Sequence, residues 1–218
     1  MGQLIFKFPF KTTYFEKDFF VSTNNFEAYK LIESWPKWPA KQINIFGPSG
    51  CGKTHLINIL SKKLKLLSVE ANQFDNKINN LLENYDCVVI ENYEGNINEN
   101  LFYSFINQII QYNKSIILNS KINIKNLEIK LIDLKSRLDS FLEIEINLPT
   151  DDLIKVIISK TFSDKQINLS SKNLEFITKN IERSYDKISK FTKDIDNLSL
   201  STGKSININL IKKVLLNE

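Results

Sequence analysis

A strand pattern, a glycine-rich loop and a helix pattern follow one another directly between residues 42 and 60. Residues 42–46 are a short β-branched run that suits a buried strand, and residues 55–60 have the apolar spacing of an amphipathic helix. Between them, residues 47–54 fit the pattern G-x-x-x-x-G-K-[ST]. Such a loop points backbone N–H groups at a polyphosphate, its Lys neutralises the phosphates and its hydroxyl holds Mg²⁺. The alternative is a glycine-rich turn that binds nothing.

The chain on both sides of this phosphate loop (residues 47–54) alternates between strand and helix patterns. Strand patterns occur at residues 65–69, 86–92, 115–120 and 142–146, and helix patterns at 25–35, 76–85 and 98–112. This alternation predicts right-handed crossovers and a five-stranded parallel sheet covered on both faces. Ligands of such folds bind at the carboxyl ends of the strands. We therefore expect the nucleotide to be contacted by Gly47, Pro48, Ser49, Gly50, Cys51, Gly52, Lys53, Thr54 and His55.

The pattern changes after Pro149 and Thr150. From residue 151 on there is no strand pattern, and helix patterns occur at 152–162, 171–182, 185–198 and 207–216. We therefore expect three parts: an N-terminal peptide (1–10), an α/β nucleotide-binding core (11–150) and a four-helix lid subdomain (151–218).

The composition is that of a globular protein. With 218 residues, 42% hydrophobic and 25% charged, the chain suffices for one domain or for a core with a small companion. No apolar run approaches the roughly 18 residues of a membrane span, and the N-terminal residues lack a signal-peptide pattern. We expect a cytoplasmic protein without membrane contact. Cys51 and Cys87 do not suggest a disulfide scaffold, and the single His, His55, gives no metal-ligand spacing.

The net charge of +4 is spread along the chain. An even distribution is more typical of a solvated surface than of a nucleic-acid footprint, which would be clustered on one face. Only Arg137 and Arg183 are Arg, and all other basic residues are Lys. Where Lys is the default cation, an Arg indicates a position that needs a planar fork of donors.

A carboxylate follows the apolar run at residues 88–90. Glu91 stands where a nucleotide-hydrolysing protein needs an acid for the Mg²⁺ bound to the phosphates, although Asp is more usual. The next position often carries a second acid that activates water, but here it is Asn92, which cannot accept a proton. We therefore expect slow hydrolysis. The alternative is that Glu91 merely ends a strand.

Several segments together resemble a known family. Residues 52–56 and 134–138, joined with residues 18–21 and 25–29, are similar to motifs of the AAA+ ATPases in their DnaA branch. Within that branch the chain resembles the Hda group, regulators that inactivate the replication initiator. The likeness runs from about residue 3 to the end and implies the AAA+ arrangement of an α/β P-loop core followed by a helical lid.

The resemblance implies roles for residues beyond the phosphate loop. Phe19, Phe20, Val21 and Asn25 correspond to the adenine-side segment, and Asn119 with Ser120 to the first sensor, where Lys121 replaces a commoner acid. Arg137 corresponds to an arginine finger that reaches the nucleotide of a neighbouring subunit; the alternative is a surface ion pair. Asp186 stands where the second-sensor Arg is expected, so Arg183 and Lys187 are the candidate replacements.

The two ends of the chain carry further expectations. Gln3, Leu4, Phe6 and Phe8 resemble the peptide by which replication proteins dock on the DNA sliding clamp, the β subunit of DNA polymerase III. The chain ends at Glu218 without the helix-turn-helix domain of a full initiator, so we expect no sequence-specific DNA binding.

These features lead to one hypothesis and two rivals. The first is an adaptor that binds ADP or ATP with Mg²⁺, docks on the clamp and offers Arg137 to ATP-bound DnaA, so that initiation stops. Its own ATPase activity is expected to be weak or absent, and homo-oligomers are compatible with it. The second is an AAA+ loader or recruitment ATPase acting on a helicase or single-stranded DNA. The third is a small-molecule P-loop kinase, which the two Arg residues do not favour.

Overall fold

The computed structural model describes residues 19, 21–203 and 205–216. The predicted clamp-binding residues Gln3, Leu4, Phe6 and Phe8 lie outside these residues, as does the predicted adenine contact Phe20. The described chain forms two compact units, an α/β unit that ends at Asn147 and a helical unit that begins at Leu148. Each unit has its own hydrophobic core.

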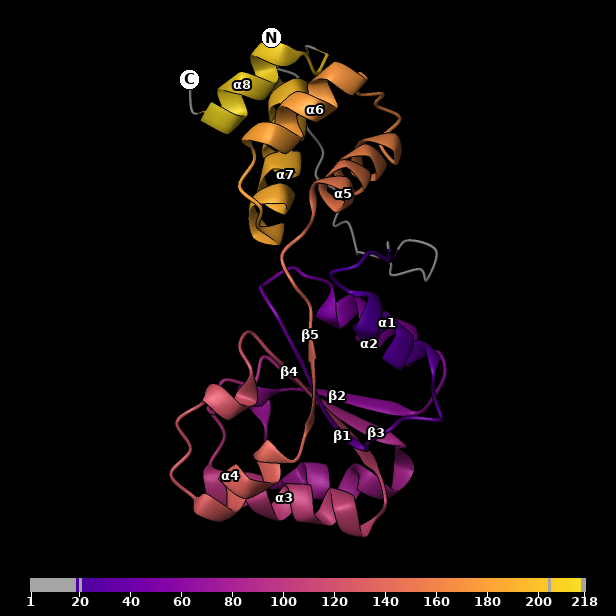
Figure 1. The fold of residues 1–218 in the computed structure, drawn as a ribbon, viewed down its shortest axis with the longest axis vertical. Helices are drawn as coiled ribbons and strands as arrows, with labels where there is room; N and C mark the ends of the chain where they lie inside the picture. Colours follow the sequence, from indigo (N-terminus) through magenta and orange to yellow (C-terminus); the bar gives the residue numbers. More distant parts are fainter. Residues whose placement is uncertain (1–18, 20, 204, 217–218) are drawn as a thin grey trace. The chain divides into compact units, whose positions relative to one another are not determined.

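The α/β unit contains a five-stranded parallel sheet, as predicted, with the order β2-β3-β4-β1-β5. Its strands are β1 (Gln42–Phe46), β2 (Leu66–Glu70), β3 (Cys87–Glu91), β4 (Ser115–Ser120) and β5 (Leu142–Glu145). Helices α1 (Phe26–Glu33) and α2 (Lys53–Leu60) lie on one side of the sheet, and α3 (Glu99–Gln111) and α4 (Ile132–Asp139) on the other (Figure 1). Strand β1, which leads into the phosphate loop, lies between β4 and β5.

The core of this unit follows from continuous apolar strands and one strongly amphipathic helix. Strands β3 and β4 are buried along their whole length, as expected for inner strands of a sheet covered on both faces. Helix α3 is capped by the preceding residue Asn98, whose Oδ1 accepts a hydrogen bond from the Leu101 amide at 3.1 Å. Its apolar face packs into the core through Phe102, Phe105, Ile106 and Ile109.

Two local elements differ from expectation. Residues 76–85, predicted as a helix, form the 3₁₀ helix η3 (Asn76–Asn84), in which only Ile78 and Leu82 are buried. The segment is rich in Asn, a poor helix former, so little favours the longer α-helical hydrogen-bond pattern. The short helix α4 has too weak a pattern to be predicted, because only Leu134 and Leu138 are buried and no side chain caps its first turn. Two further 3₁₀ turns are η2 (Ala71–Gln73) and η4 (Ile124–Asn126).

The helical unit consists, in its described residues, of α5 (Asp151–Ser163), α6 (Ser171–Asn180), α7 (Tyr185–Thr202) and α8 (Ile208–Leu216). The side chains of Thr150 and Ser170 cap the starts of α5 and α6. Gly203 ends α7 with φ 64°, a left-handed conformation that suits Gly. The core comprises Ile154, Ile158, Phe162, Ile177, Ile181, Ile188, Phe191, Ile195, Leu210 and Ile211.

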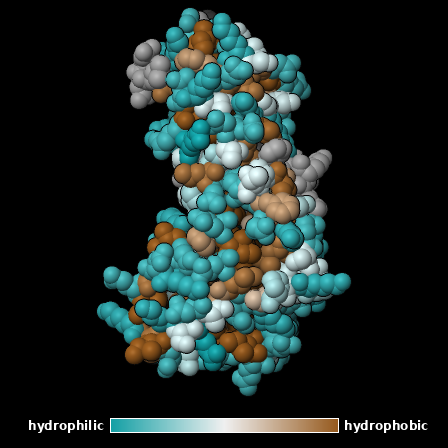
Figure 2. All heavy atoms as spheres, viewed as in Figure 1, coloured by the Kyte–Doolittle hydropathy of each residue, from teal (hydrophilic) through white to brown (hydrophobic). Residues whose placement is uncertain are grey.

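The surface is mixed. Hydrophilic residues cover much of the face shown in Figure 2, with apolar residues interspersed among them, as is normal at a protein surface. Among the described helices, none combines the length and the apolar character needed to cross a membrane.

Candidate nucleotide-binding site

The phosphate loop leaves the carboxyl end of β1 and leads directly into α2. Gly52 is the residue before the helix and has φ 102°, so a side chain there would be strained. The first N–H groups of an α-helix have no partner within the helix, and the helix dipole favours negative charge at this end. The loop and the start of α2 therefore form an arrangement suited to phosphate groups.

Gly47 fits closely against the neighbouring backbone. A Cβ atom on Gly47 would lie 2.3 Å from the carbonyl oxygen of Ile146, a distance that no side chain tolerates. The Gly47 amide donates to the carbonyl of Ser120 at 3.2 Å. The loop is thus anchored between the ends of β4 and β5, and only Gly fits at its first position.

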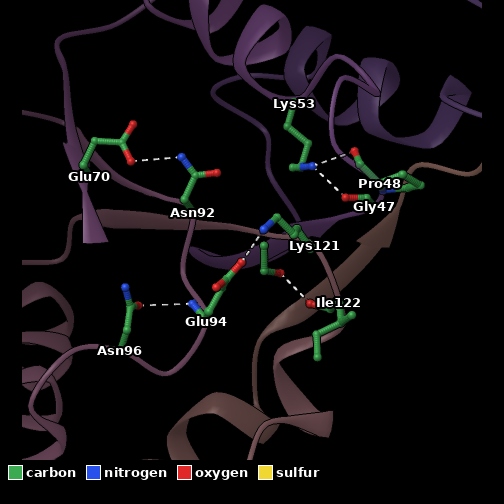
Figure 3. Close-up of polar contacts among 10 residues, drawn as sticks. Gly47, Pro48, Lys53, Glu70, Asn92, Glu94, Asn96, Lys121 and Ile122 are labelled. Carbon is green, nitrogen blue, oxygen red and sulfur yellow. Dashed lines mark hydrogen bonds and ion pairs between the residues drawn. The ribbon is translucent and has the colours of Figure 1, made fainter. Parts of the chain in front are cut away.

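Lys53 is held by its own loop. Its Nζ donates to the carbonyl oxygens of Gly47 at 2.7 Å and Pro48 at 3.1 Å (Figure 3). The Cys51 thiol lies 3.6 Å from the same Nζ. Burial raises the pKa of this thiol, and the nearby ammonium offsets part of the effect. The lysine cation is therefore already directed into the loop.

Glu91 is the buried acid of the site. It ends β3, is 6% exposed, and its Oε2 accepts a hydrogen bond from Asn119 Nδ2 at 2.9 Å. Burial raises the pKa of Glu91, and the charge of Glu70 adds to the rise. Asn119, Lys53 and the Thr54 hydroxyl act in the opposite direction. The carboxylate thus lies near the Lys and the hydroxyl of the phosphate loop.

The oxygen atoms around Glu91 fit a hard divalent cation. Among the described residues, Glu91 Oε1 is buried without a hydrogen-bond partner, and so is Asn119 Oδ1. The Thr54 hydroxyl interacts with the same carboxylate. Carboxylate, hydroxyl and amide oxygens are the ligands that Mg²⁺ prefers. Glu91 and Thr54 are therefore suited to hold Mg²⁺, with the phosphates and water as its other ligands.

Asn92 turns away from the strand direction. It adopts φ 57° and donates from Nδ2 to Glu70 Oε2 at 2.9 Å (Figure 3). An amide at this position cannot act as a general base. The sequence did not single out Glu70, because its position beside Glu91 depends on the pairing of β2 with β3.

The first-sensor residues divide into two groups. Asn119 is buried and bonded to Glu91, whereas Ser120 donates from Oγ to the carbonyl of Ile122 at 2.6 Å and so serves the loop after β4. Lys121 is exposed and pairs with Glu94 at 2.8 Å. Ser120 Oγ also accepts from Asn44 Nδ2 at 2.8 Å, a contact that a polar residue inside an apolar strand pattern could have indicated.

Of the adenine-side residues that the structure describes, Phe19 lies against the phosphate loop, whereas Asn25 and Val21 make other contacts. The Phe19 ring stacks on Tyr29 with centroids 5.8 Å apart and lies 5.1 Å from the ring of His55. It also lies beside Gly52, where a Cβ would come within 3.1 Å of it. Asn25 is buried and accepts from the Ser22 amide through Oδ1 at 2.9 Å, so this oxygen stabilises a turn. Val21 lines a small surface hollow with Phe26 and Glu27.

The two arginines have different surroundings. Arg137 lies on α4 with an exposed side chain, and its guanidinium forms no hydrogen bond or ion pair with any other described residue. Arg183 belongs to the helical unit and pairs with Asp151 at 2.8 Å. Lys187 lies 3.4 Å from Glu182. The residues that the structure brings together around the phosphate loop are Lys53, Thr54, Glu91, Asn119 and Phe19 with His55.

The likeness to solved structures concerns the whole described fold. Domain III of the Thermotoga maritima replication initiation protein DnaA has a TM-score of 0.78 and 19% identity, covering 96% of this chain and 98% of that one. AMPPCP-bound DnaA from Aquifex aeolicus has a TM-score of 0.71 and 19% identity, with coverage of 84% and 65%. The RuvB branch migration motor of T. maritima gives 0.65 and 20%, with coverage of 88% and 65%. The fold is that of an AAA+ P-loop core.

The sequence is similar to those of DnaA replication initiators. DnaA of Borrelia duttonii is 28% identical in an alignment that covers 96% of this chain and 54% of that protein. DnaA of Buchnera aphidicola is likewise 28% identical, with coverage of 87% and 48%. The chain thus spans about half the length of the curated relatives it matches. No protein-family model matches it.

Proposed function

We propose that this AAA+ chain is a DnaA-related adaptor that binds an adenine nucleotide, docks on the DNA sliding clamp and stimulates ATP hydrolysis by DnaA. Its effect would be to limit replication initiation. The observation that carries the proposal is the contrast between two residues. Asn92 replaces the acid that would activate water in its own site, whereas Arg137 is exposed with a guanidinium available to a partner.

The nucleotide part rests on the phosphate loop and on the structural neighbours. DnaA of Aquifex aeolicus binds AMPPCP, an ATP analogue, on the same fold. In this chain the phosphates would contact the N–H groups between Gly47 and Thr54 and the Lys53 ammonium, after Lys53 leaves the carbonyls of Gly47 and Pro48. Thr54 and Glu91 would hold Mg²⁺, and Phe19 would flank the base. ADP and ATP both fit this scheme.

The proposed contact of Arg137 with a partner requires that the guanidinium N–H groups are available to donate. An arginine finger spreads positive charge over the transferring and leaving phosphates of a neighbouring subunit, which contributes about 10³-fold or more to the rate in related phosphoryl transfer. Such a residue must be exposed and must not be neutralised by its own chain. Arg183, by contrast, already pairs with Asp151.

The test is DnaA ATP hydrolysis in the presence of DNA-loaded clamp and this protein. We expect Arg137→Ala to reduce the stimulation by at least about a hundredfold, since the trans charge is lost. Arg137→Lys should restore little of it, because an ammonium lacks the planar fork. Lys135→Ala, an exposed cation on the same helix, is the matched control and should stimulate like the parent. Full stimulation by Arg137→Ala would refute the mechanism.

A second candidate is an AAA+ recruitment ATPase that acts on single-stranded DNA or a helicase. One observation favours it: a solved DnaA of similar fold is bound to both AMPPCP and single-stranded DNA, with a TM-score of 0.70. This candidate predicts measurable ATPase activity and binding to single-stranded oligonucleotides that weakens steeply with salt. The adaptor proposal predicts neither.

A further inference from the structure

Glu70 and Glu91 occupy matching positions in neighbouring strands. They are the last residues of β2 and β3 and are direct partners in the register of this parallel pair. In-register residues of adjacent parallel strands point to the same face of the sheet, and the strands are about 4.8 Å apart. The two acidic residues are therefore neighbours at the carboxyl ends of the strands, on the same edge of the sheet as the phosphate loop. The charge of Glu70 accordingly adds to the raised pKa of Glu91.

Asn92 fixes the direction of Glu70. Because Asn92 adopts φ 57°, its side chain turns toward β2 and donates from Nδ2 to Glu70 Oε2 at 2.9 Å (Figure 3). Figure 3 shows the Glu70 carboxylate turned toward the Asn92 amide. The bond involves one oxygen of an otherwise exposed carboxylate, so the other oxygen is open to a further partner.

A second observation points to a ligand at the carboxyl end of β3. Glu91 is 6% exposed, and its Oε1 has no hydrogen-bond partner among the described residues. A buried carboxylate oxygen without a partner is costly, and a like charge on the adjacent strand increases the cost. A divalent cation offsets both effects, because it satisfies the oxygen and neutralises the pair.

We propose that Glu70, held by Asn92, joins Glu91 as a second acidic partner of the divalent cation that accompanies the nucleotide. The proposal rests on the nucleotide site of the proposed function and extends it to a residue outside the phosphate loop and β3. Mg²⁺ gives up its water ligands reluctantly, so Glu70 acts by accepting a hydrogen bond from one of those waters. Asn92 thus keeps an acid at the site by holding one from the next strand.

The test measures binding of fluorescent mant-ADP and mant-ATP to the full chain, first in EDTA and then as MgCl₂ is added. Glu70→Gln is expected to raise, by about tenfold, the Mg²⁺ concentration that gives half of the Mg²⁺-dependent change in nucleotide binding. A factor of this size is typical of losing an outer-sphere partner of a metal. Affinity in EDTA should stay within about twofold of the parent value, because Glu70 acts through the cation. Asn92→Ala should shift the Mg²⁺ dependence in the same direction by a smaller factor, because Glu70 remains but is no longer held.

The controls separate this role from general charge and from folding. Glu94→Gln removes a nearby exposed acid that pairs with Lys121, and it should leave the Mg²⁺ dependence unchanged. Thermal unfolding without nucleotide reports whether each variant is folded, and Glu70→Asp serves as the conservative variant that retains part of the Mg²⁺ effect.

The outcomes are distinguishable. Unchanged Mg²⁺ dependence in folded Glu70→Gln overturns the inference and leaves the proposed function standing. If Glu70→Gln bound the nucleotide more tightly by the same factor in EDTA and in MgCl₂, Glu70 would only repel the phosphates. That result also overturns the inference. A parent chain that binds neither mant nucleotide refutes the nucleotide site itself and the inference with it.

Discussion

At the scale of single residues, Glu91 is subject to opposing electrostatic effects. Burial and Glu70 favour its protonated form, whereas Asn119, Lys53 and Thr54 favour the carboxylate. Its carboxylate is buried beside Asn119, with Glu70 on the adjacent strand and Lys53 in the loop. Burial is the largest influence on its pKa and favours the protonated form. A buried carboxylate with little solvation is suited to binding a cation. Without the cation, the same carboxylate lowers the stability of the folded protein.

The raised pKa of Glu91 predicts a pH-dependent difference in stability between the parent and Glu91→Gln. Because the pKa of Glu91 in the folded state is raised above its ordinary value of 4.5, the folded form binds the proton more tightly than the unfolded form. Stability from this group is therefore full below pH 4.5 and is lost as the pH rises through the raised pKa. Glu91→Gln should be more stable than the parent at neutral pH, with the gap closing toward pH 4.5.

Urea unfolding across this pH range, without nucleotide or metal, measures the difference. Glu94→Gln is the control, since an exposed carboxylate should change stability by no more than about 0.5 kcal/mol. A Glu91→Gln variant that is less stable than the parent at neutral pH would contradict the expectation.

At the scale of elements, Asn44 links three segments around the phosphate loop. From the middle of β1, its Nδ2 donates to the Leu118 carbonyl at 2.9 Å and to Ser120 Oγ at 2.8 Å. Its Oδ1 accepts from the Ile124 amide at 3.2 Å. A single buried amide thus joins β1 to the end of β4 and to η4, and Ser120 in turn contacts Gly47 through its carbonyl.

Replacing this amide should therefore destabilise the α/β unit. Asn44→Leu preserves the volume but leaves the Ile124 amide without its partner and removes the hydrogen bond that Ser120 Oγ accepts, which costs about 2 kcal/mol or more. Guanidinium unfolding checks the value. Asn96→Ala, which removes an exposed amide, should fall within about 0.5 kcal/mol of the parent. Equal stability of the two variants would show that the Asn44 bonds contribute little.

The same elements show what the sequence could predict. Strands β3 and β4 are continuous apolar runs, and the phosphate loop has a fixed spacing, so the parallel sheet and the positions of Lys53 and Glu91 followed from local patterns. Glu70 and Asn44 did not, because their partners lie on other strands and are fixed only by register. Helix α4 was missed because Leu134 and Leu138 alone give too short a pattern.

At the scale of the whole molecule, the chain combines two units with separate cores. The α/β unit carries the phosphate loop and Arg137, and the helical unit carries Arg183 in its ion pair with Asp151. The proposed partner contacts therefore come from distant parts of the sequence. The proposed clamp contact involves residues 3–8, which lie outside the described chain, and it is inferred from the sequence pattern.

We expect Gln3→Ala combined with Phe6→Ala to abolish capture of the chain by immobilised sliding clamp. The resemblance to a clamp-binding peptide rests on Gln3 and on the apolar residues Leu4, Phe6 and Phe8, and Lys7 is not part of that pattern. Lys7→Ala is therefore the matched control and should be captured like the parent. Failure of the parent to bind would favour the recruitment ATPase, and equal capture of the double variant would place the contact elsewhere.

The hydrogen bonds between Lys53 and the carbonyls of Gly47 and Pro48 have a consequence for ligand choice. An incoming nucleotide must draw the lysine away from two good acceptors, so every ligand must first compensate for the loss of these two hydrogen bonds. A single phosphate offers too few acceptors and too little charge to recover it, whereas a chain of two or three engages both the lysine and the helix start. We therefore expect the loop to favour ligands with two or three phosphates over ligands with one.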